Sequence, residues 1–322
     1  MVIDNARELR VAAIQMESQN GRIKANLEHA LPFVEEASKK GAELIVLPEF
    51  MPTGYIFTKA IWEAGETRHG LTVQWLKEHS RRLGVYLGTS FLEADGDDFF
   101  NTFVLATPDG NEAGRVRKQT PAAFEAYFTK GDTGSHVINT EFGKIGVGIC
   151  YENMLSYMPQ LMYAYSVDIM LMPHSAPSPM KSILTPKKAI NAFHSNLKEL
   201  ATKYAKLLGI PVIMVNKSGK WETPLPGIPF LKQVSSFPGF TAIADSDGSL
   251  KAQLGNEEAV IVRDVVLDPS RKKKSKLEYH GRWTEDFPWG IKIWRQVEAM
   301  GRIWYSLSSE RKRRASEISS RK

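Results

Sequence analysis

The sequence predicts a layered α/β fold with a mixed sheet. Short apolar runs typical of strands alternate along the chain with segments whose apolar residues recur at helical spacing. This alternation is typical of layered α/β proteins. Three Asp-Gly turns lie between strand-like segments, and such turns join antiparallel strands in hairpins. We therefore expect antiparallel pairs beside parallel ones, and not a purely parallel sheet.

The first half of the chain is predicted to hold two helices and several strands. Apolar residues recur at helical spacing in residues 22–40 and 71–83. Pro48 ends the first clear buried strand, because proline has no N–H to donate within a sheet. A Pro-Asp-Gly turn inside an alternating segment predicts a hairpin. The strands expected in this half are residues 42–47, residues 85–91 and the two arms of a hairpin over residues 101–118.

The second half continues the alternation. Its predicted strands are residues 144–150, 167–172, 210–215, 240–244 and 259–266, and its predicted helices are residues 154–166 and 187–208. The last two strands belong to a meander that turns at a Ser-Asp-Gly sequence.

Composition indicates a globular protein with an appendage. A chain of 322 residues with 43% hydrophobic residues can bury a large core. Residues 1–270 contain no linker-like stretch, so we expect one domain there. Residues 271–322 form a basic C-terminal extension with runs of Lys and Arg at 271–276 and 311–314. Its aromatic residues favour packing against protein over disorder; they include Trp289, Trp294, Trp304 and Tyr305.

The basic extension accounts for much of the net charge of +6. Basic runs can bind nucleic acid. No recognition helix or zinc-finger pattern accompanies them, so we favour a solvated tail or a contact with another subunit, and nucleic acid is not expected. No apolar stretch is long enough to span a bilayer and no apolar signal region begins the chain, so no membrane partner is expected. A lone cysteine fits a reducing cytoplasm.

Cys150 is the single cysteine of the chain, and it ends a predicted strand just before a helical pattern. Without a second cysteine it closes no disulfide within the chain. At a strand-to-helix turn, backbone N–H groups and the helix dipole favour a thiolate, which suits a nucleophile. The alternative is that Cys150 is a buried and inert packing residue.

Two further residues could complete a site for acyl transfer. Glu49 lies at the carboxyl end of the strand that Pro48 stops, the edge at which open α/β sheets place their sites. Lys118 follows the predicted hairpin. A carboxylate held away from water can take the proton of a thiol. An ammonium group and a backbone N–H can stabilise the negative charge that develops when the thiol attacks an amide or nitrile carbon.

These segments resemble the nitrilase (carbon–nitrogen hydrolase) superfamily over roughly residues 9 to 266. The resemblance rests on their order and spacing together, since each motif alone is weak. The motifs are Leu-Pro-Glu49-Phe after a strand, Arg-Lys118 after the Asn-Thr and Pro-Asp-Gly hairpin, Gly-Val-Gly-Ile-Cys150-Tyr-Glu-Asn, the opening strand at residues 10–16, Val-Asn216-Lys-Ser-Gly, and residues 239–248.

The resemblance implies a four-layer α-β-β-α sandwich followed by the C-terminal extension. It also implies a triad of Glu49, Lys118 and Cys150, with a second glutamate, Glu125, beside it. Members of the superfamily commonly extend their C-terminus across a dimer interface. We therefore expect a homodimer or a higher homo-oligomer, with residues 271–322 as a possible oligomerisation arm.

Three more residues are candidates for substrate binding or support of the triad: Tyr151, Glu152 and His174. The Glu152-Asn pair after the nucleophile is similar to that of true nitrilases, whereas family amidases commonly have Asp. Tyr151 stands where those nitrilases usually have tryptophan, and the segment from Gln119 to Glu125 lacks their pattern. His174 follows a predicted strand, where it can line a pocket or be a packed residue.

The resulting expectation is a cysteine-dependent hydrolase that cleaves a non-peptide carbon–nitrogen bond of a small molecule. We favour an amide substrate, with a nitrile as the close alternative. A catalytically silent binding or scaffold protein of the same fold is the alternative from another class. The histidines show no paired metal-ligand spacing, and the sequence has no P-loop or dinucleotide-binding glycine motif, so no metal or cofactor is expected.

Overall fold

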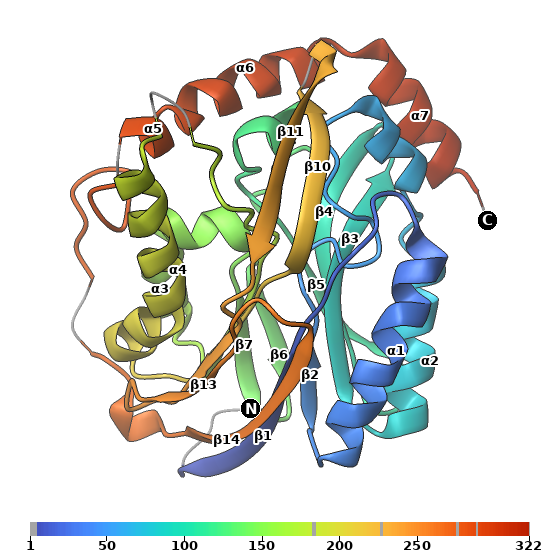
Figure 1. Ribbon diagram of the computed structural model, residues 1–322. Helices are drawn as coiled ribbons and strands as arrows, with labels where there is room; N and C mark the ends of the chain where they lie inside the picture. Colours follow the sequence, from blue (N-terminus) through green and yellow to red (C-terminus); the bar gives the residue numbers. More distant parts are fainter. Residues whose placement is uncertain (1–4, 182–184, 226–227, 275–276, 288, 322) are drawn as a thin grey trace.

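The computed structural model describes residues 5–181, 185–225, 228–274, 277–287 and 289–321. Two six-stranded sheets stack face to face, and helices cover both outer faces (Figure 1). The predicted four-layer α-β-β-α sandwich is confirmed. The helices on one outer face are α1 (Ile23–Lys39) and α2 (Leu71–Leu83), and those on the other are α3 (Tyr157–Tyr165) and α4 (Lys187–Leu208).

The first sheet has the strand order β14-β1-β2-β3-β4-β5. Its strands are β1 (Arg7–Gln15), β2 (Leu44–Val46), β3 (Tyr86–Asp95), β4 (Asp98–Ala106), β5 (Glu112–Arg117) and β14 (Ala259–Leu267). β2 pairs in parallel with both β1 and β3, whereas β4 pairs antiparallel with β3 and with β5. This sheet is mixed, as predicted.

The second sheet has the order β13-β12-β9-β8-β7-β6 and is mixed in the same way. Its strands are β6 (Val137–Thr140), β7 (Gly143–Val147), β8 (Ile169–Pro173), β9 (Val212–Val215), β12 (Ala242–Ala244) and β13 (Leu250–Gln253). The central strands β7, β8 and β9 are parallel to one another.

β1 shows why the central strands are apolar throughout. Side chains of a strand point alternately to its two faces. Val11 and Ala13 belong to the core between the two sheets, whereas Ala12 and Ile14 pack toward α1 and α2. Both faces are therefore buried, and a strand buried on both faces has a continuous apolar run instead of an alternating one.

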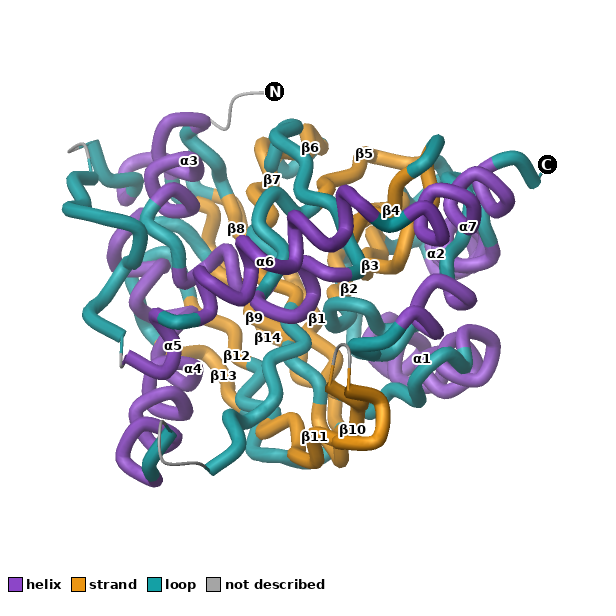
Figure 2. Tube along the Cα trace, turned by 90° about the horizontal axis from the view of Figure 1, so that it is seen from above, coloured by secondary structure: helices purple, strands orange, loops and turns teal. Residues whose placement is uncertain are grey.

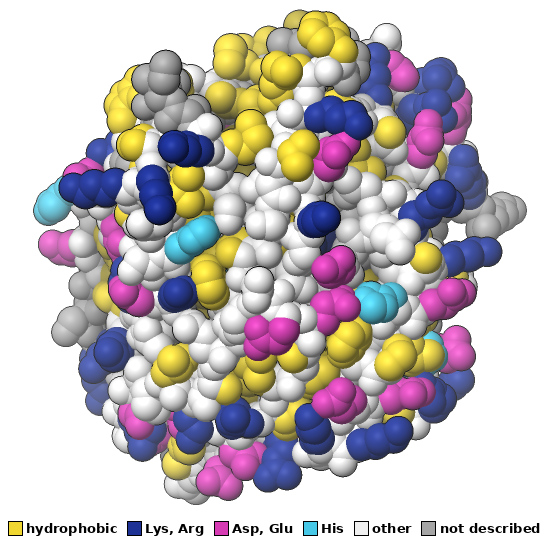
Figure 3. Space-filling view, viewed as in Figure 1, with side chains coloured by type: hydrophobic (Ala, Val, Ile, Leu, Met, Phe, Trp, Pro, Cys, Tyr) yellow, Lys and Arg dark blue, Asp and Glu magenta, His cyan; other side chains and the backbone are white. Residues whose placement is uncertain are grey.

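A long hairpin, β10 (Ser218–Leu225) and β11 (Ile228–Pro238), lies outside the two sheets and was not predicted. Several prolines interrupt this segment, and proline normally argues against a strand. The hairpin extends toward α6, and apolar side chains gather at this end of the molecule (Figure 3). Exposed apolar side chains there are Phe230, Leu231 and Val234 of β11 and Met300, Ile303 and Leu307 of α6.

The C-terminal extension folds over its own chain. It contains α5 (Trp289–Lys292), α6 (Trp294–Leu307) and α7 (Ser309–Ser319), and α6 crosses over the end of both sheets (Figure 2). The Tyr305 hydroxyl accepts a hydrogen bond from the Phe99 N–H at 2.8 Å. Tyr305 thus packs within the chain as predicted, whereas Trp289 is 63% exposed, and the role of residues 271–322 in oligomerisation stays a prediction.

Some lysine and arginine side chains of the two basic runs form ion pairs within the chain. Lys272 forms an ion pair with Asp168 at 2.6 Å, and the buried Arg311 pairs with Asp98 at 2.7 Å. Residues 275 and 276 of the first run lie outside the described residues. None of the helices in the described part of the chain is both long enough and apolar enough to cross a membrane.

Candidate active site

The ends of three strands bring the predicted triad to one region of the sandwich. Glu49 follows β2, Lys118 follows β5, and Cys150 begins the 3-10 helix η3 (Cys150–Met154) after β7. The Lys118 Nζ lies 2.6 Å from Glu49 Oε1 and 2.6 Å from Glu125 Oε2. The buried ammonium group of Lys118 thus bridges the carboxylates of Glu49 and Glu125. Cys150 is close enough for the charges of these three groups to shift its pKa.

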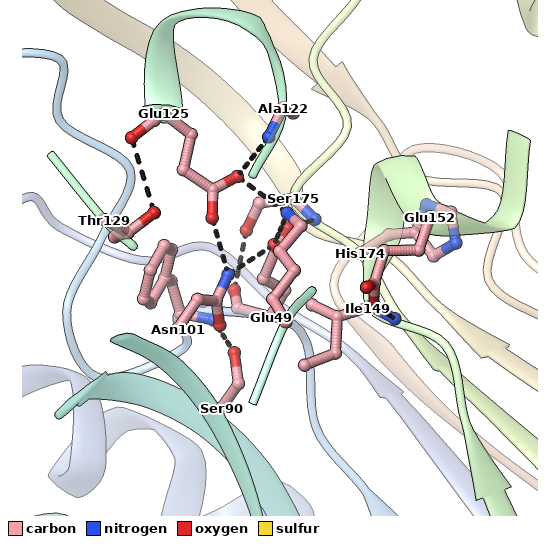
Figure 4. A network of polar contacts seen from close by, with 12 residues as sticks. Glu49, Ser90, Asn101, Ala122, Glu125, Thr129, Ile149, Glu152, His174 and Ser175 are labelled. Atoms are coloured by element: carbon pink, nitrogen blue, oxygen red, sulfur yellow. Dashed lines mark hydrogen bonds and ion pairs between the residues drawn. The ribbon is translucent and has the colours of Figure 1, made fainter. Parts of the chain in front are cut away.

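Asn101 and Ser175 hold the carboxylates in place (Figure 4). The Asn101 side-chain amide donates to Glu49 Oε1 at 2.7 Å and to Glu125 Oε1 at 3.0 Å. The Ser175 backbone N–H donates to Glu49 Oε2 at 2.7 Å. Each oxygen of the Glu49 carboxylate therefore has at least one fixed donor, which orients the group.

The buried cluster contains one cation and two carboxylates, and its pKa shifts follow from that. Burial lowers the pKa of Lys118, but Glu125 and Glu49 outweigh burial and raise it overall, so Lys118 stays protonated. Burial raises the pKa of Glu125, and the charge of Glu49 raises it further against the opposing effect of Lys118. The ammonium group of Lys118 therefore stays charged between the two carboxylates, and the charges of all three groups act on Cys150.

Cys150 has a backbone φ of 54°, in the left-handed region that residues with a Cβ seldom adopt. Such strain is often found at functional sites. Burial, and then the negative charge of Glu49, raise the pKa of the thiol well above its usual value. The expectation that the strand-to-helix turn favours a thiolate is therefore wrong in direction. The helix is a single 3-10 turn, and burial is the largest cause of the raised pKa.

Lys217 is a second buried lysine near the triad, and sequence reasoning gave it no role. Its Nζ donates to the backbone carbonyl of Phe50 at 2.9 Å. Burial lowers its pKa to about 7, although Glu49 and Cys150 oppose this shift. Phe50 itself has a φ of 48°, so this bond helps to hold a strained residue directly after Glu49.

Glu152 supports the site from behind the pocket. It is completely buried, and its Oε1 accepts hydrogen bonds from the Gln119 N–H at 2.7 Å and the Tyr157 hydroxyl at 2.8 Å. Its Oε2 accepts from the Ile149 N–H at 2.9 Å. One carboxylate thus ties the residue after Lys118 to the residue before Cys150.

His136 is the charged partner of Glu152, at 3.2 Å. Burial raises the pKa of Glu152, but His136 and the backbone donors outweigh this and lower it overall. Burial likewise lowers the pKa of His136, and Glu152 outweighs burial and raises it. Each partner therefore favours the charged form of the other.

We expect Glu152→Gln to lower the free energy of unfolding by about 3 kcal/mol, because a buried acceptor is replaced by a donor that faces N–H groups. Urea denaturation at pH 7 measures the loss. Since the pKa of Glu152 is lowered in the folded state, its stabilisation is lost as the pH falls through that pKa, and the difference from wild type should shrink in acid. The exposed Glu63→Gln is the control and should change stability by less than about 0.5 kcal/mol. An equally small effect of Glu152→Gln would contradict the supporting role.

A pocket of about 220 Å³ opens beside the cysteine, and Cys150, Tyr151, His174 and Ser175 all contribute to its wall. Burial, with a smaller effect of Lys118, lowers the pKa of His174 to about 3, so its ring is neutral. Its Nε2 lies 3.1 Å from the Asn153 side-chain amide. Of the supporting residues predicted from sequence, Tyr151 and His174 thus reach the pocket and Glu152 does not.

Sequence reasoning missed Asn101, Ser175 and Lys217. Asn101 lies in β4 among apolar residues, and a buried amide in a strand interior is a signal that could have identified it. Ser175 acts mainly through its backbone N–H, which carries no sequence signal. Lys217 lies in one of the motifs that carried the resemblance, but a lysine there gives no indication of burial.

A family model described as carbon-nitrogen hydrolase matches residues 10–274. The chain belongs to the carbon–nitrogen hydrolase family. The predicted membership of the nitrilase superfamily is thereby confirmed, and the protein is a carbon–nitrogen hydrolase. The match ends near the start of the extension, so α5, α6 and α7 lie beyond it.

This carbon–nitrogen hydrolase has relatives of both expected kinds. It is 32% identical over 186 residues to a protein named nitrilase from Pyrococcus abyssi, covering 56% of this chain and 71% of that one. It is 27% identical over 279 residues to N-carbamoylputrescine amidase of Arabidopsis thaliana, covering 83% and 90%. Its fold is similar to a crystal structure of carbon-nitrogen hydrolase from Helicobacter pylori G27, with a TM-score of 0.68, 20% identity and coverage of 94% and 96%.

Proposed function

We propose that this carbon–nitrogen hydrolase cleaves a small amide to a carboxylate and ammonia or an amine, through a thioester on Cys150. The observation that supports this most is the buried contact of Lys118 with Glu49 at 2.6 Å, next to a cysteine on a pocket wall. This arrangement supplies a base, a fixed cation and a nucleophile with access to a small molecule.

In the proposed first step, Glu49 takes the proton of the Cys150 thiol as the sulfur attacks the carbonyl carbon. The raised pKa of Cys150 makes a neighbouring base necessary, because few of the thiols are ionised at neutral pH. Lys118 and the backbone N–H of Tyr151 stabilise the oxyanion. The Tyr151 N–H lies in the first turn of η3, where a helix has no internal partner for its N–H groups.

Collapse of the adduct breaks the carbon–nitrogen bond, and the proton held by Glu49 leaves with the amine. Glu49 then takes a proton from water, whose oxygen attacks the thioester carbon. The carbon–sulfur bond breaks, the acid leaves as its carboxylate, and Glu49 returns the proton to the sulfur of Cys150. Glu125 contributes by holding Lys118 between two carboxylates, so that the ammonium group keeps its charge and its position throughout.

A nitrile is the second candidate substrate. The 32% identity to the Pyrococcus abyssi nitrilase supports this alternative. With a nitrile the first adduct is a thioimidate, which must add one more water. Glu152 does not help to choose between the substrates, because its carboxylate is directed at backbone N–H groups, Tyr157 and His136. The longer match to an amidase, over 83% of this chain, supports the amide.

A panel of small amides, carbamoyl compounds and nitriles, with ammonia release as the readout, tests the proposal. We expect turnover of at least one amide above that of its matching nitrile. Faster turnover of the nitriles would favour the second candidate. Ammonia release from neither class, by protein that is folded by circular dichroism, would favour a silent binding or scaffold protein.

A further inference from the structure

The pocket beside Cys150 has a mostly apolar and aromatic wall. A dry cavity of about 150 Å³ can hold a benzene molecule, so the 220 Å³ here has room for a ring on a short chain. The apolar and aromatic side chains of the wall include Phe57, Phe124, Met154, Phe193, Leu197, Leu200, Trp221, Phe287 and Trp294.

One side of this wall comes from the C-terminal extension. Thr284, Glu285, Phe287 and Trp294 line the pocket, although all four lie beyond the family match. The extension is fixed to the nucleophile's own helix, because the Thr284 N–H donates to the Met154 carbonyl at 3.0 Å.

Aromatic contacts reinforce that attachment. The rings of Trp283 and Trp294 each lie 5.9 Å from the ring of Tyr151, centre to centre. Contacts at this distance are typical of stabilising aromatic pairs. The extension therefore packs directly on the residue that follows Cys150.

The wall offers little charge to a substrate. Among its described residues, Glu285 has the single carboxylate and none has an ammonium or guanidinium group; His174 is neutral, and Lys203 pairs with Glu285 at 2.8 Å. Asn196 and Gln233 add uncharged amides, which can form hydrogen bonds but cannot neutralise an ion. A charged group entering this pocket would lose water and would meet, among the described lining residues, a single carboxylate that Lys203 already neutralises, which is unfavourable.

We propose that the preferred substrates are amides or nitriles whose acyl side carries a bulky, uncharged apolar group such as an arylalkyl chain, and that Phe287 and Trp294 of the C-terminal extension select this group. The inference rests on the proposed function for its chemistry. It assigns to Phe287 and Trp294 the role of determining substrate specificity, separate from the residues that break the bond.

A matched substrate series tests the preference in the wild-type protein. Propionamide is compared with its derivatives carrying phenyl, carboxylate or aminomethyl on the third carbon, together with the corresponding nitriles. We expect kcat/KM for the phenyl compound to exceed that for propionamide by at least about tenfold, the scale of discrimination by an apolar pocket. Both charged compounds should be poorer than propionamide. A charged compound that equals or exceeds the phenyl compound would overturn the inference.

Variants of the extension test which residues select the group. Phe287→Ala and Trp294→Ala should each lower the ratio of kcat/KM for the phenyl compound to kcat/KM for propionamide by about tenfold or more. Trp294→Phe should restore most of the loss. Trp289→Ala is the matched control, because Trp289 is 63% exposed in the same segment and does not line the pocket. Equal losses for both substrates would contradict a role in selection.

Failure of this inference can be told apart from failure of the proposed function. If propionamide is hydrolysed but the phenyl compound gains nothing, the chemistry stands and the specificity proposal falls. If none of the amides or nitriles is hydrolysed and none leaves an acyl group on Cys150 in mass spectra, the proposed function itself falls.

Discussion

Replacing Cys150 by Ala is expected to abolish ammonia release, with a loss in kcat of at least about 10⁴-fold, the scale seen when a nucleophile is removed. The chain has no other thiol to replace it. The fold should persist, because the change removes a single buried atom and costs about 1–2 kcal/mol at most. Ammonia release over a long incubation, measured beside urea denaturation, checks both expectations.

Cys150→Ser is the companion variant, since it keeps the size of the side chain and changes its nucleophilicity. It should also be inactive, because in the proposed mechanism Glu49 deprotonates a thiol, and a hydroxyl is a much weaker acid. Ammonia release near the wild-type rate by either variant, after a repeat purification, would disprove a thioester mechanism.

Glu49→Gln and Lys118→Ala should each lower kcat by at least about a hundredfold, as expected for a lost base or a lost oxyanion donor. Because both act on the same bond-forming step, the double variant should be little worse than either single one. Steady-state ammonia release by the three variants measures this. Losses that multiply in the double variant would show that the two residues do not act together.

The Lys118 variant needs a separate stability measurement. Removing the ammonium group leaves Glu49 and Glu125 buried without their cation, and breaking a buried pair costs about 3–5 kcal/mol. Glu49→Gln keeps the shape of the side chain but turns an amide N–H toward the donors Lys118 and Asn101 or Ser175, so its stability is measured in the same way. If Lys118→Ala is unfolded, the contrast between Glu49→Gln and wild type decides the role of the base.

The triad positions could be predicted because each residue ends a strand whose pattern is clear in the sequence. Glu49, Lys118 and Cys150 follow β2, β5 and β7, and the resemblance to a family added the expectation that these ends meet. Asn101 could not be placed in the same way. Its role depends on β4 lying next to β3 and β5, which is a property of the sheet order.

The pKa of Cys150 and the start of the helix that follows it could not be predicted. Each depends on how opposing effects balance in the folded protein, and the sequence does not give that balance. The pKa of Cys150 is raised because burial and Glu49 outweigh Lys118 and the backbone donor at Ser175. The helix predicted for residues 154–166 begins later, at Tyr157, after the separate 3-10 turn that starts with Cys150. The positive φ of Cys150 lies at the start of that turn.

The position of the C-terminal helices has an evolutionary consequence. The groups proposed to break the bond all lie within the first 151 residues, whereas one wall of the substrate pocket is encoded after residue 280. Mutation, recombination or exchange of the last part of the gene can therefore alter which molecules fit without altering the machinery that cleaves them. In such a protein, the catalysed reaction and the range of accepted substrates can change at different rates during evolution.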